Sequence, residues 1–155
     1  MCIESVVEFS RARGIINGEQ LTPANDSMTL QSYKDLDVWQ RAVDLAVVVD
    51  ELSESLLRTR KYSMADQLAR AALSVSSNIA EGNGRLHTAE YVHHLSMSNG
   101  SLREVESILY VAIRCKRLDG SQCAPAFALI ELIGRMLTNL RNALRRRLRA
   151  GRRSP

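Results

Sequence analysis

The sequence predicts an all-α fold, an antiparallel up-down-up-down bundle of four helices, and three observations support this class. Four long stretches carry apolar residues at alternating spacings of three and four, which is typical of one face of an amphipathic helix. Short polar or glycine-containing segments separate these stretches. Aromatic residues make up only 5% of the 155 residues, and the chain contains three prolines. Long helices joined by short loops pack as antiparallel neighbours, so the bundle is the most economical arrangement.

The chain is expected to form one domain with an extension at each end. Residues 1–31 combine turn-forming residues with no sustained periodicity, so we expect a mobile N-terminal extension with at most one weak turn of helix at 3–9. The periodicity begins just after this segment, which indicates Met28 as a candidate for the natural start. Residues 32–149 are expected to form the bundle, and residues 150–155 a basic C-terminal tail.

The first helix is expected from about Asp35 to Arg58, with Ser32 or Asp35 as its N-cap. Trp39 is the only tryptophan, and we expect it to anchor the neighbouring helices. The predicted buried stripe contains Leu36, Trp39, Val43, Ala46, Val49 or Asp50, Leu52 and Leu56.

The second helix is expected from Ser63 to about Glu81. Its predicted buried stripe contains Ala65, Leu68, Ala72, Val75 and Ile79. Many neighbouring positions hold alanine or serine, and such small side chains let a second helix approach closely. Gly82 and Gly84 follow, and we expect them to take the positive φ of a helix C-cap and a tight turn.

The third helix is expected from His87 or Thr88 to about Leu118 and has the most regular periodicity in the chain. Its predicted buried stripe contains Tyr91, Leu95, Ser98, Leu102, Val105, Leu109 and Ala112. Gly100 lies in mid-helix, where glycine is unfavourable, so its presence predicts the close approach of another backbone. Cys115 is interpreted as a small core residue.

The fourth helix is expected to open at Pro125, a residue suited to a first helical turn, after Asp119 and Gly120 end the third helix. Its predicted buried stripe contains Phe127, Ile130, Ile133 or Gly134, Leu137, Leu140, Leu144 and Leu148. This helix runs directly into a series of arginines.

Three motifs fall on these helices: Y-K-D-L-D-V-W-Q-R-A-V-D-L from Tyr33, Q-x-x-R-A-A-x-S-x-x-x-N-I-A-E-G-x-G-R from Gln67, and E-Y-x-x-x-L with a later G-S-L-x-E-x-E from Glu90. Over about residues 33–145 the chain resembles the 23S rRNA-intervening-sequence protein family of four-helix-bundle proteins. The N-terminal extension and the arginine-rich end depart from the family pattern, as does His87, where the family more often has a serine cap.

The resemblance implies a homo-oligomer, a pentamer of bundles arranged as a barrel. Relatives were first noticed as reading frames inside insertions in ribosomal RNA genes. A more distant bundle relative is the accessory protein of diversity-generating retroelements, which assists a reverse transcriptase and binds nucleic acid. The resemblance therefore implies a fold and self-assembly more firmly than it implies an activity.

The formal net charge of +4 is unevenly distributed. Residues 1–134 carry 13 basic and 17 acidic residues, whereas residues 135–155 carry eight arginines and no acid. Guanidinium groups neutralise phosphates and release counterions, so this end predicts nucleic-acid binding. The candidate residues are Arg141, Arg145, Arg146, Arg147, Arg149, Arg152 and Arg153. Basic residues also complement a helix C-terminus, by about 0.3 to 1 kcal/mol each, but eight arginines exceed that need.

A second basic cluster, Arg58, Arg60 and Lys61, falls in the loop after the first helix. Loops alternate between the two ends of an antiparallel bundle, so this cluster is expected at the end opposite to the C-terminus. We interpret it as a solvated loop and not as part of the same patch.

The polar residues in and after the second helix are interpreted as structural: Gln67, Arg70, Ser74, Asn78, Glu81, Gly82 and Arg85. We expect their hydrogen bonds to fix helix register, to cap the turn or to join subunits. A catalytic role would need a base beside Ser74 or Ser77, and the sequence places no histidine or lysine there.

No cofactor, metal site or membrane span is expected. Glu90 and His93 match half of a di-iron motif, but the sequence has no second copy. The three cysteines show no CxxC spacing, so neither a disulfide framework nor a zinc site is indicated. No run approaches about 18 apolar residues and no signal peptide is evident, so we place the protein in the cytoplasm.

The sequence thus favours a non-enzymatic, homo-oligomeric bundle that binds RNA or DNA through its C-terminal arginines. The alternative is a protein-interaction adaptor whose ring presents grooves to a partner such as a polymerase. In that case the arginines only aid solubility.

Overall fold

The computed structural model describes residues 32–151 and is all-α in this range, which confirms the predicted fold class. A short 3-10 helix is followed by four long α-helices, and the described residues contain no strand. The elements are η1 (Tyr33–Asp35), α2 (Asp37–Arg58), α3 (Tyr62–Asn83), α4 (Thr88–Arg114) and α5 (Gly120–Gly151).

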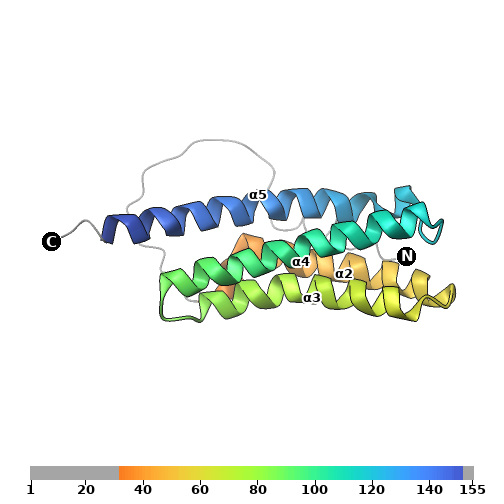
Figure 1. Ribbon diagram of the computed structural model, residues 1–155, viewed down its shortest axis with the longest axis horizontal. Helices are drawn as coiled ribbons and strands as arrows, with labels where there is room; N and C mark the ends of the chain where they lie inside the picture. Colours follow the sequence, from red (N-terminus) through yellow and green to blue (C-terminus); the bar gives the residue numbers. More distant parts are fainter. Residues whose placement is uncertain (1–31, 152–155) are drawn as a thin grey trace.

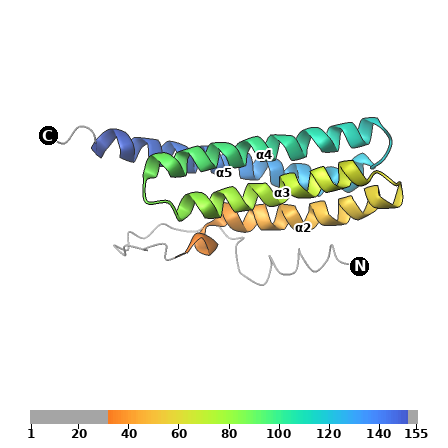
Figure 2. The same ribbon diagram turned by 60° about the horizontal axis from the view of Figure 1, so that its bottom comes forward.

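The four α-helices run alternately up and down along one axis and surround a single apolar core (Figures 1 and 2). Each helix packs against two others: α2 and α4 both contact α3 and α5. The arrangement is a four-helix bundle, as short loops between long amphipathic helices dictate. The fully buried centre consists mainly of leucine, isoleucine and valine side chains.

The start of α2 differs from the prediction. Ser32 caps η1 with a capping box, in which its hydroxyl accepts from the Lys34 amide and the Asp35 carboxylate accepts from the Ser32 amide. Trp39 is only half-buried and packs edge-on against Tyr33, with ring centroids 5.1 Å apart. Leu36 is buried as predicted, but Val38, Ala42 and Leu45 are buried in place of Trp39, Val43 and Ala46, which lie one position later in each case. The buried residues of α2 are Val38, Ala42, Leu45, Val49, Leu52, Ser53 and Leu56.

The predicted stripes of α3 and α4 are confirmed. All five stripe residues of α3 are buried, and on α4 the same holds from Leu95 to Ala112, with Tyr91 half-buried. Ser98 is completely buried on the α4 stripe, and its hydroxyl donates to the Val75 carbonyl oxygen of α3 at 2.9 Å. Alanine and serine at the contact therefore bring two helices together and leave the buried hydroxyl satisfied.

Two glycine predictions were wrong. Gly82 lies inside α3 and Gly84 caps it with φ of −77°, so neither position uses positive φ. A Cβ atom at Gly82 would lie 2.6 Å from the Tyr91 ring and 2.7 Å from the Cβ atom of His94, so the glycine permits close packing of α4. Gly100 was expected at such a contact, but a Cβ atom there would meet nothing within 4 Å.

The α4–α5 connection also departs from the prediction. The α4 helix ends at Arg114, so Cys115 is exposed at its C-cap, whereas Cys123 is buried in the core. The α5 helix begins before Pro125, and Asp119 caps it by accepting hydrogen bonds at 2.8 Å from the amide and the hydroxyl of Ser121. These bonds lower the pKa of the Asp119 carboxyl. At the start of α3, Ser63 is not a cap, because the helix begins at Tyr62 without a side-chain cap.

The α5 helix is the longest element, with 32 residues, and it extends past the turn between α3 and α4 (Figures 1 and 2). By length and composition it could span a membrane, since one window within Gly120–Ala150 has a mean hydropathy of 1.3. Only 28% of that window is buried in the bundle, where the branched apolar side chains at 130, 133 and 137 are at most 2% exposed. A core helix gives the same hydropathy signal as a span.

Several sequence predictions lie outside the described residues. These are the extension at 1–31 with its weak helical turn, Met28 as a natural start, and the side chains of Arg152 and Arg153. The predicted boundary at 149/150 does not coincide with a helix end, because α5 continues to Gly151.

Candidate functional site

The C-terminal arginines lie on the last turns of α5. Arg145, Arg146, Arg147 and Arg149 are exposed, whereas Arg141 is half-buried. Leu144 is buried and Leu148 half-buried, so one side of this segment still packs on the bundle while the arginines occupy the remaining faces. The amphipathic period that forms the helix thus also presents the guanidinium groups to solvent.

No acidic residue follows Glu131 in the chain. Glu131 pairs with Arg135, one turn further along the same face. Among the residues that the structure describes, the arginines from 141 onward form no ion pair. Arginines crowded on neighbouring turns repel one another, and a bound polyanion would relieve that repulsion.

The turn between α3 and α4 lies at the same end of the bundle. Glu81 pairs there with Arg85, and its carboxylate lies 3.8 Å from the Nε2 atom of the buried His94. A surface hollow of about 440 Å³ is lined by Arg85, Ala89, Glu90, His93 and His94. His94 lies one position before the stripe residue Leu95, and it is buried because Gly82 has no side chain to keep it out of the interface.

The polar residues of α3 face α4. The Gln67 amide donates to the Glu104 carboxylate, and Arg70 donates to the Gln67 amide oxygen at 2.9 Å. The Ser101 hydroxyl donates to the Ser74 hydroxyl at 2.9 Å.

Within α3, the amide of Asn78 donates to the carbonyl and hydroxyl oxygens of Ser74 at 2.8 and 3.0 Å. With the bond from Ser98, these contacts place polar links along the α3–α4 interface. They hold two helices at one register and provide no nucleophile with an adjacent base.

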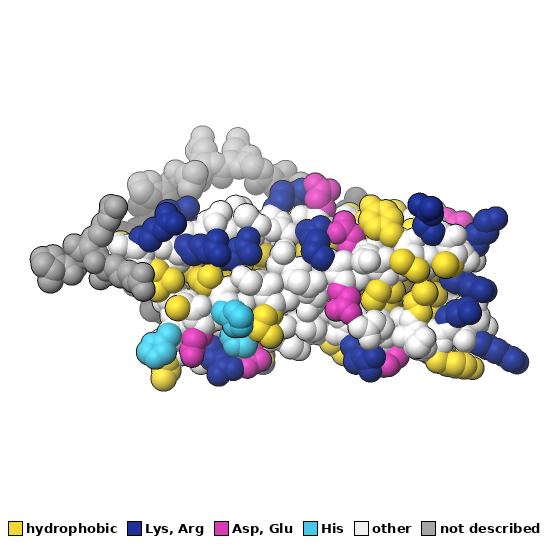
Figure 3. All heavy atoms as spheres, viewed as in Figure 1, with side chains coloured by type: hydrophobic (Ala, Val, Ile, Leu, Met, Phe, Trp, Pro, Cys, Tyr) yellow, Lys and Arg dark blue, Asp and Glu magenta, His cyan; other side chains and the backbone are white. Residues whose placement is uncertain are grey.

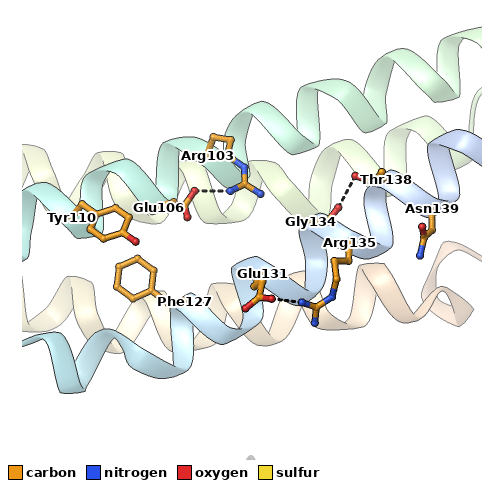
Figure 4. A pocket seen from close by; sticks show the side chains of 9 residues that line it. All are labelled: Arg103, Glu106, Tyr110, Phe127, Glu131, Gly134, Arg135, Thr138 and Asn139. Atoms are coloured by element: carbon orange, nitrogen blue, oxygen red, sulfur yellow. Dashed lines mark hydrogen bonds and ion pairs between the residues drawn. The ribbon is translucent and has the colours of Figure 1, made fainter.

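A groove of about 610 Å³ lies between α4 and α5 on the outside of the bundle (Figure 4). Tyr110 and Phe127 pack against each other in it, with ring centroids 4.8 Å apart. Farther along, Arg103 pairs with Glu106 across one turn of α4. This groove is not evident from the sequence, because Tyr110 lies off the α4 stripe and only the packing of α5 brings Phe127 beside it.

Basic side chains also gather at the opposite end of the bundle, where Lys and Arg cover much of the right-hand end in Figure 3. The α2–α3 loop is there, as predicted, and the α4–α5 loop lies beside it (Figure 1). The two loops bring together Arg58, Arg60, Lys61, Arg114, Lys116 and Arg117, all of them exposed. The second trio was missed because 52 residues or more separate it from the first along the chain.

Within the described range, no group of three or more His, Cys, Asp or Glu side chains gathers closely enough to hold a metal ion. Burial raises the pKa of the Tyr91 hydroxyl, whose oxygen has no hydrogen-bond partner among the described residues. Burial, together with the charge of Asp119, raises the pKa of the Cys123 thiol. Both residues belong to the packing between helices.

Comparison with known proteins agrees with the motifs on α2, α3 and α4. The model of the 23S rRNA-intervening sequence protein family matches residues 34–139, which covers most of the bundle and stops before the arginine cluster. The chain belongs to this family. The arginines from 141 onward therefore lie beyond the segment that defines the family.

A solved structure from Bacteroides thetaiotaomicron, a protein with unknown function from the S23 ribosomal protein family, has the same fold. Its TM-score is 0.64 at 21% identity, and the match covers 66% of this chain and 96% of that one. No curated protein matches the sequence.

Proposed function

We propose that this family member is a non-enzymatic nucleic-acid-binding protein that holds the phosphate backbone of RNA or DNA with its C-terminal arginines. The observation that carries the proposal is the exposed group Arg145, Arg146, Arg147 and Arg149 on the last turns of α5, with no acid after Glu131. Guanidinium groups at this density exceed what a helix C-terminus needs, and they bind phosphates without reading sequence.

The proposal includes self-assembly in the cytoplasm as a homopentameric barrel. The family resemblance supports it, as do large apolar side chains exposed on the outer helix faces: Val47, Leu73, Met97, Tyr110 and Val111. Five copies would place five arginine clusters on one rim, and this multivalency would strengthen weak individual contacts.

Fluorescence anisotropy with a labelled structured RNA, titrated at several salt concentrations, tests the function. A variant truncated before Arg145 is expected to bind more weakly and to show a shallower salt dependence, because each lost phosphate contact lowers the slope by roughly 0.9. Equal binding by the truncated and full-length chains would remove the arginines from the mechanism. Light scattering with absorbance at 260 and 280 nm reports the oligomer mass and copurifying nucleic acid together.

The groove between α4 and α5 favours a second candidate function, that of a protein-interaction adaptor for a partner such as a polymerase. Exposed aromatic surface flanked by arginines is typical of protein interfaces, and Tyr110 with Arg103 and Arg135 provides it. Affinity purification that recovers one stoichiometric protein after nuclease treatment would support this function. Loss of all partners with nuclease would favour the nucleic-acid function.

A further inference from the structure

The helices α2 and α4 end in the same way. Lys61 donates its amide to the Leu56 carbonyl and Arg60 donates to Leu57, at 3.1 and 2.9 Å. This pair of bonds is the Schellman motif.

At the end of α4, Arg117 donates to Ala112 and Lys116 to Ile113, at 2.8 and 2.9 Å. The two termini therefore share a hydrogen-bond pattern and lie at the same end of the bundle (Figure 1).

The two loops also share a sequence pattern. In R-T-R-K at 58–61 and R-C-K-R at 114–117, the first, third and fourth positions are basic. The third position takes the left-handed conformation in both, with φ of 59° at Arg60 and 55° at Lys116. Glycine is the favoured residue at this position because it has no Cβ atom to clash. The left-handed conformation therefore does not account for a basic side chain there in both loops.

Little on the protein neutralises these six charges. Of these six side chains, Arg58 alone forms an ion pair within the described residues. Its partner is Glu54, at 3.9 Å, and both side chains are largely exposed. Asp119 is close in sequence, but its carboxylate is engaged in capping α5. The Arg58–Glu54 pair is exposed and long, so it neutralises little of this charge.

We propose that this end, formed by Arg58, Arg60, Lys61, Arg114, Lys116 and Arg117, is a second phosphate-backbone surface for nucleic acid. This surface would bind the same class of ligand as the C-terminal arginines, but through different residues. The helices between the two ends have 22 to 27 residues, which corresponds to roughly 33 to 40 Å. That separation is several times the Debye length of about 8 to 10 Å, so the potential at each surface is set by its own charges.

Nucleic acid fits this end better than an anionic membrane does. The large exposed apolar side chains within one turn of these loops are Leu57, Tyr62, Tyr110 and Val111, a small set beside six cations. Tyr62 is 63% exposed and directly follows Lys61, and an aromatic ring among cations is suited to stacking on an unpaired base.

The test uses full-length chains in a two-by-two set. The loop-end variant is R60G/K61Q/K116G/R117Q, in which glycine suits the left-handed positions and the fold is preserved. The tail variant is R145Q/R146Q/R147Q/R149Q, and a third chain combines both sets. The matched control is R41Q/R70Q/R103Q/R135Q, which removes the same charge from arginines that are paired with acids along the helices.

Anisotropy of a fluorescein-labelled RNA hairpin is measured against salt concentration. Each end variant is expected to retain binding with a salt slope lower by about 2 to 4, as expected for up to four lost phosphate contacts. The combined variant is expected to lose at least a hundredfold in affinity at low salt, and the control to lose less than either end variant. Unchanged melting temperatures establish that folding is intact.

The outcomes separate this inference from the proposed function. A tail variant that binds no RNA, or a loop-end variant with an unchanged slope, overturns the second surface. If the loop-end variant loses RNA binding and the tail variant binds normally, the result supports the second surface. The same result contradicts the proposed role of the tail. The loop-end variant is also tested for sedimentation with phosphatidylserine vesicles. If it no longer sediments with them but still binds RNA unchanged, this end binds membranes and the proposal is overturned.

Discussion

The two interfaces of α4 are packed by different side chains. On α3 it meets alanine, serine and a glycine, and buried or half-buried hydroxyls bond across the contact. On α5 it meets large side chains, and an open groove lined by Tyr110, Phe127 and Arg103 remains between the helices (Figure 4). Small residues let helices close on each other, whereas large residues at the margin of a contact keep surface available for ligands.

The largest effect is expected from Ala72→Leu in the core stripe of α3. Ala72 is 1% exposed, and the added carbons have no space, so overpacking should destabilise the protein by about 3 kcal/mol. Denaturant unfolding measures this effect, and light scattering follows oligomer mass. Ala128→Leu on an exposed face of α5 is the control. An unchanged melting temperature and mass for Ala72→Leu would show that this stripe is not tightly packed.

Glycine-to-alanine substitutions compare the two interfaces directly. Gly82→Ala should destabilise by about 2 kcal/mol, because the Tyr91 ring and the His94 Cβ atom cannot both move away cheaply. Gly134→Ala meets the end of a flexible Arg103 side chain at 2.8 Å and should be nearly neutral. Gly100→Ala meets nothing and should stabilise by about 0.5 to 1 kcal/mol. Equal melting temperatures for the first two variants would remove the distinction between the interfaces.

Ser98→Ala should have a smaller effect, about 1 kcal/mol, because it removes one buried hydrogen bond and leaves the shape almost unchanged. Ser107→Ala, at an exposed position of the same helix, is the matched control. Chemical denaturation of both variants checks this, and identical unfolding midpoints would mean that the hydroxyl bond to Val75 adds nothing to the α3–α4 contact.

Thiol reactivity should distinguish the end of α4 from the core with no effect on stability. Iodoacetamide is expected to modify Cys115, which is exposed, and to spare Cys123, which is buried with a raised pKa. Peptide mass spectrometry after brief labelling of the folded protein measures both sites, with urea-unfolded protein as the reference. Faster labelling of Cys123 would contradict the packing of α5 on the bundle.

The helical class and the buried stripes of α3 and α4 were predictable because a local period of three and four residues determines them. The same reasoning was wrong by one position in the first turns of α2, where Val38, Ala42 and Leu45 are buried in place of Trp39, Val43 and Ala46. It was also wrong for Cys115, since the end of α4 depends on a Schellman motif without glycine. Local period gives the face of a helix, but termini depend on a few specific bonds.

The candidate site was predictable only in part. The arginines from 145 to 149 stand out because charge composition needs no structure to be seen. The functional groups that were missed come from pairs of distant segments: Tyr110 with Phe127, and the loop at 58–61 with the loop at 114–117. No local pattern relates these segments to each other.

The sequence by itself determined the amphipathic helices, their antiparallel order and the concentration of arginine at the end of α5, because each follows from local spacing or composition. Only the tertiary structure decided why Gly82 is a glycine and where the groove lies. These features depend on which residues of different helices meet, and that follows from packing the whole core at one register.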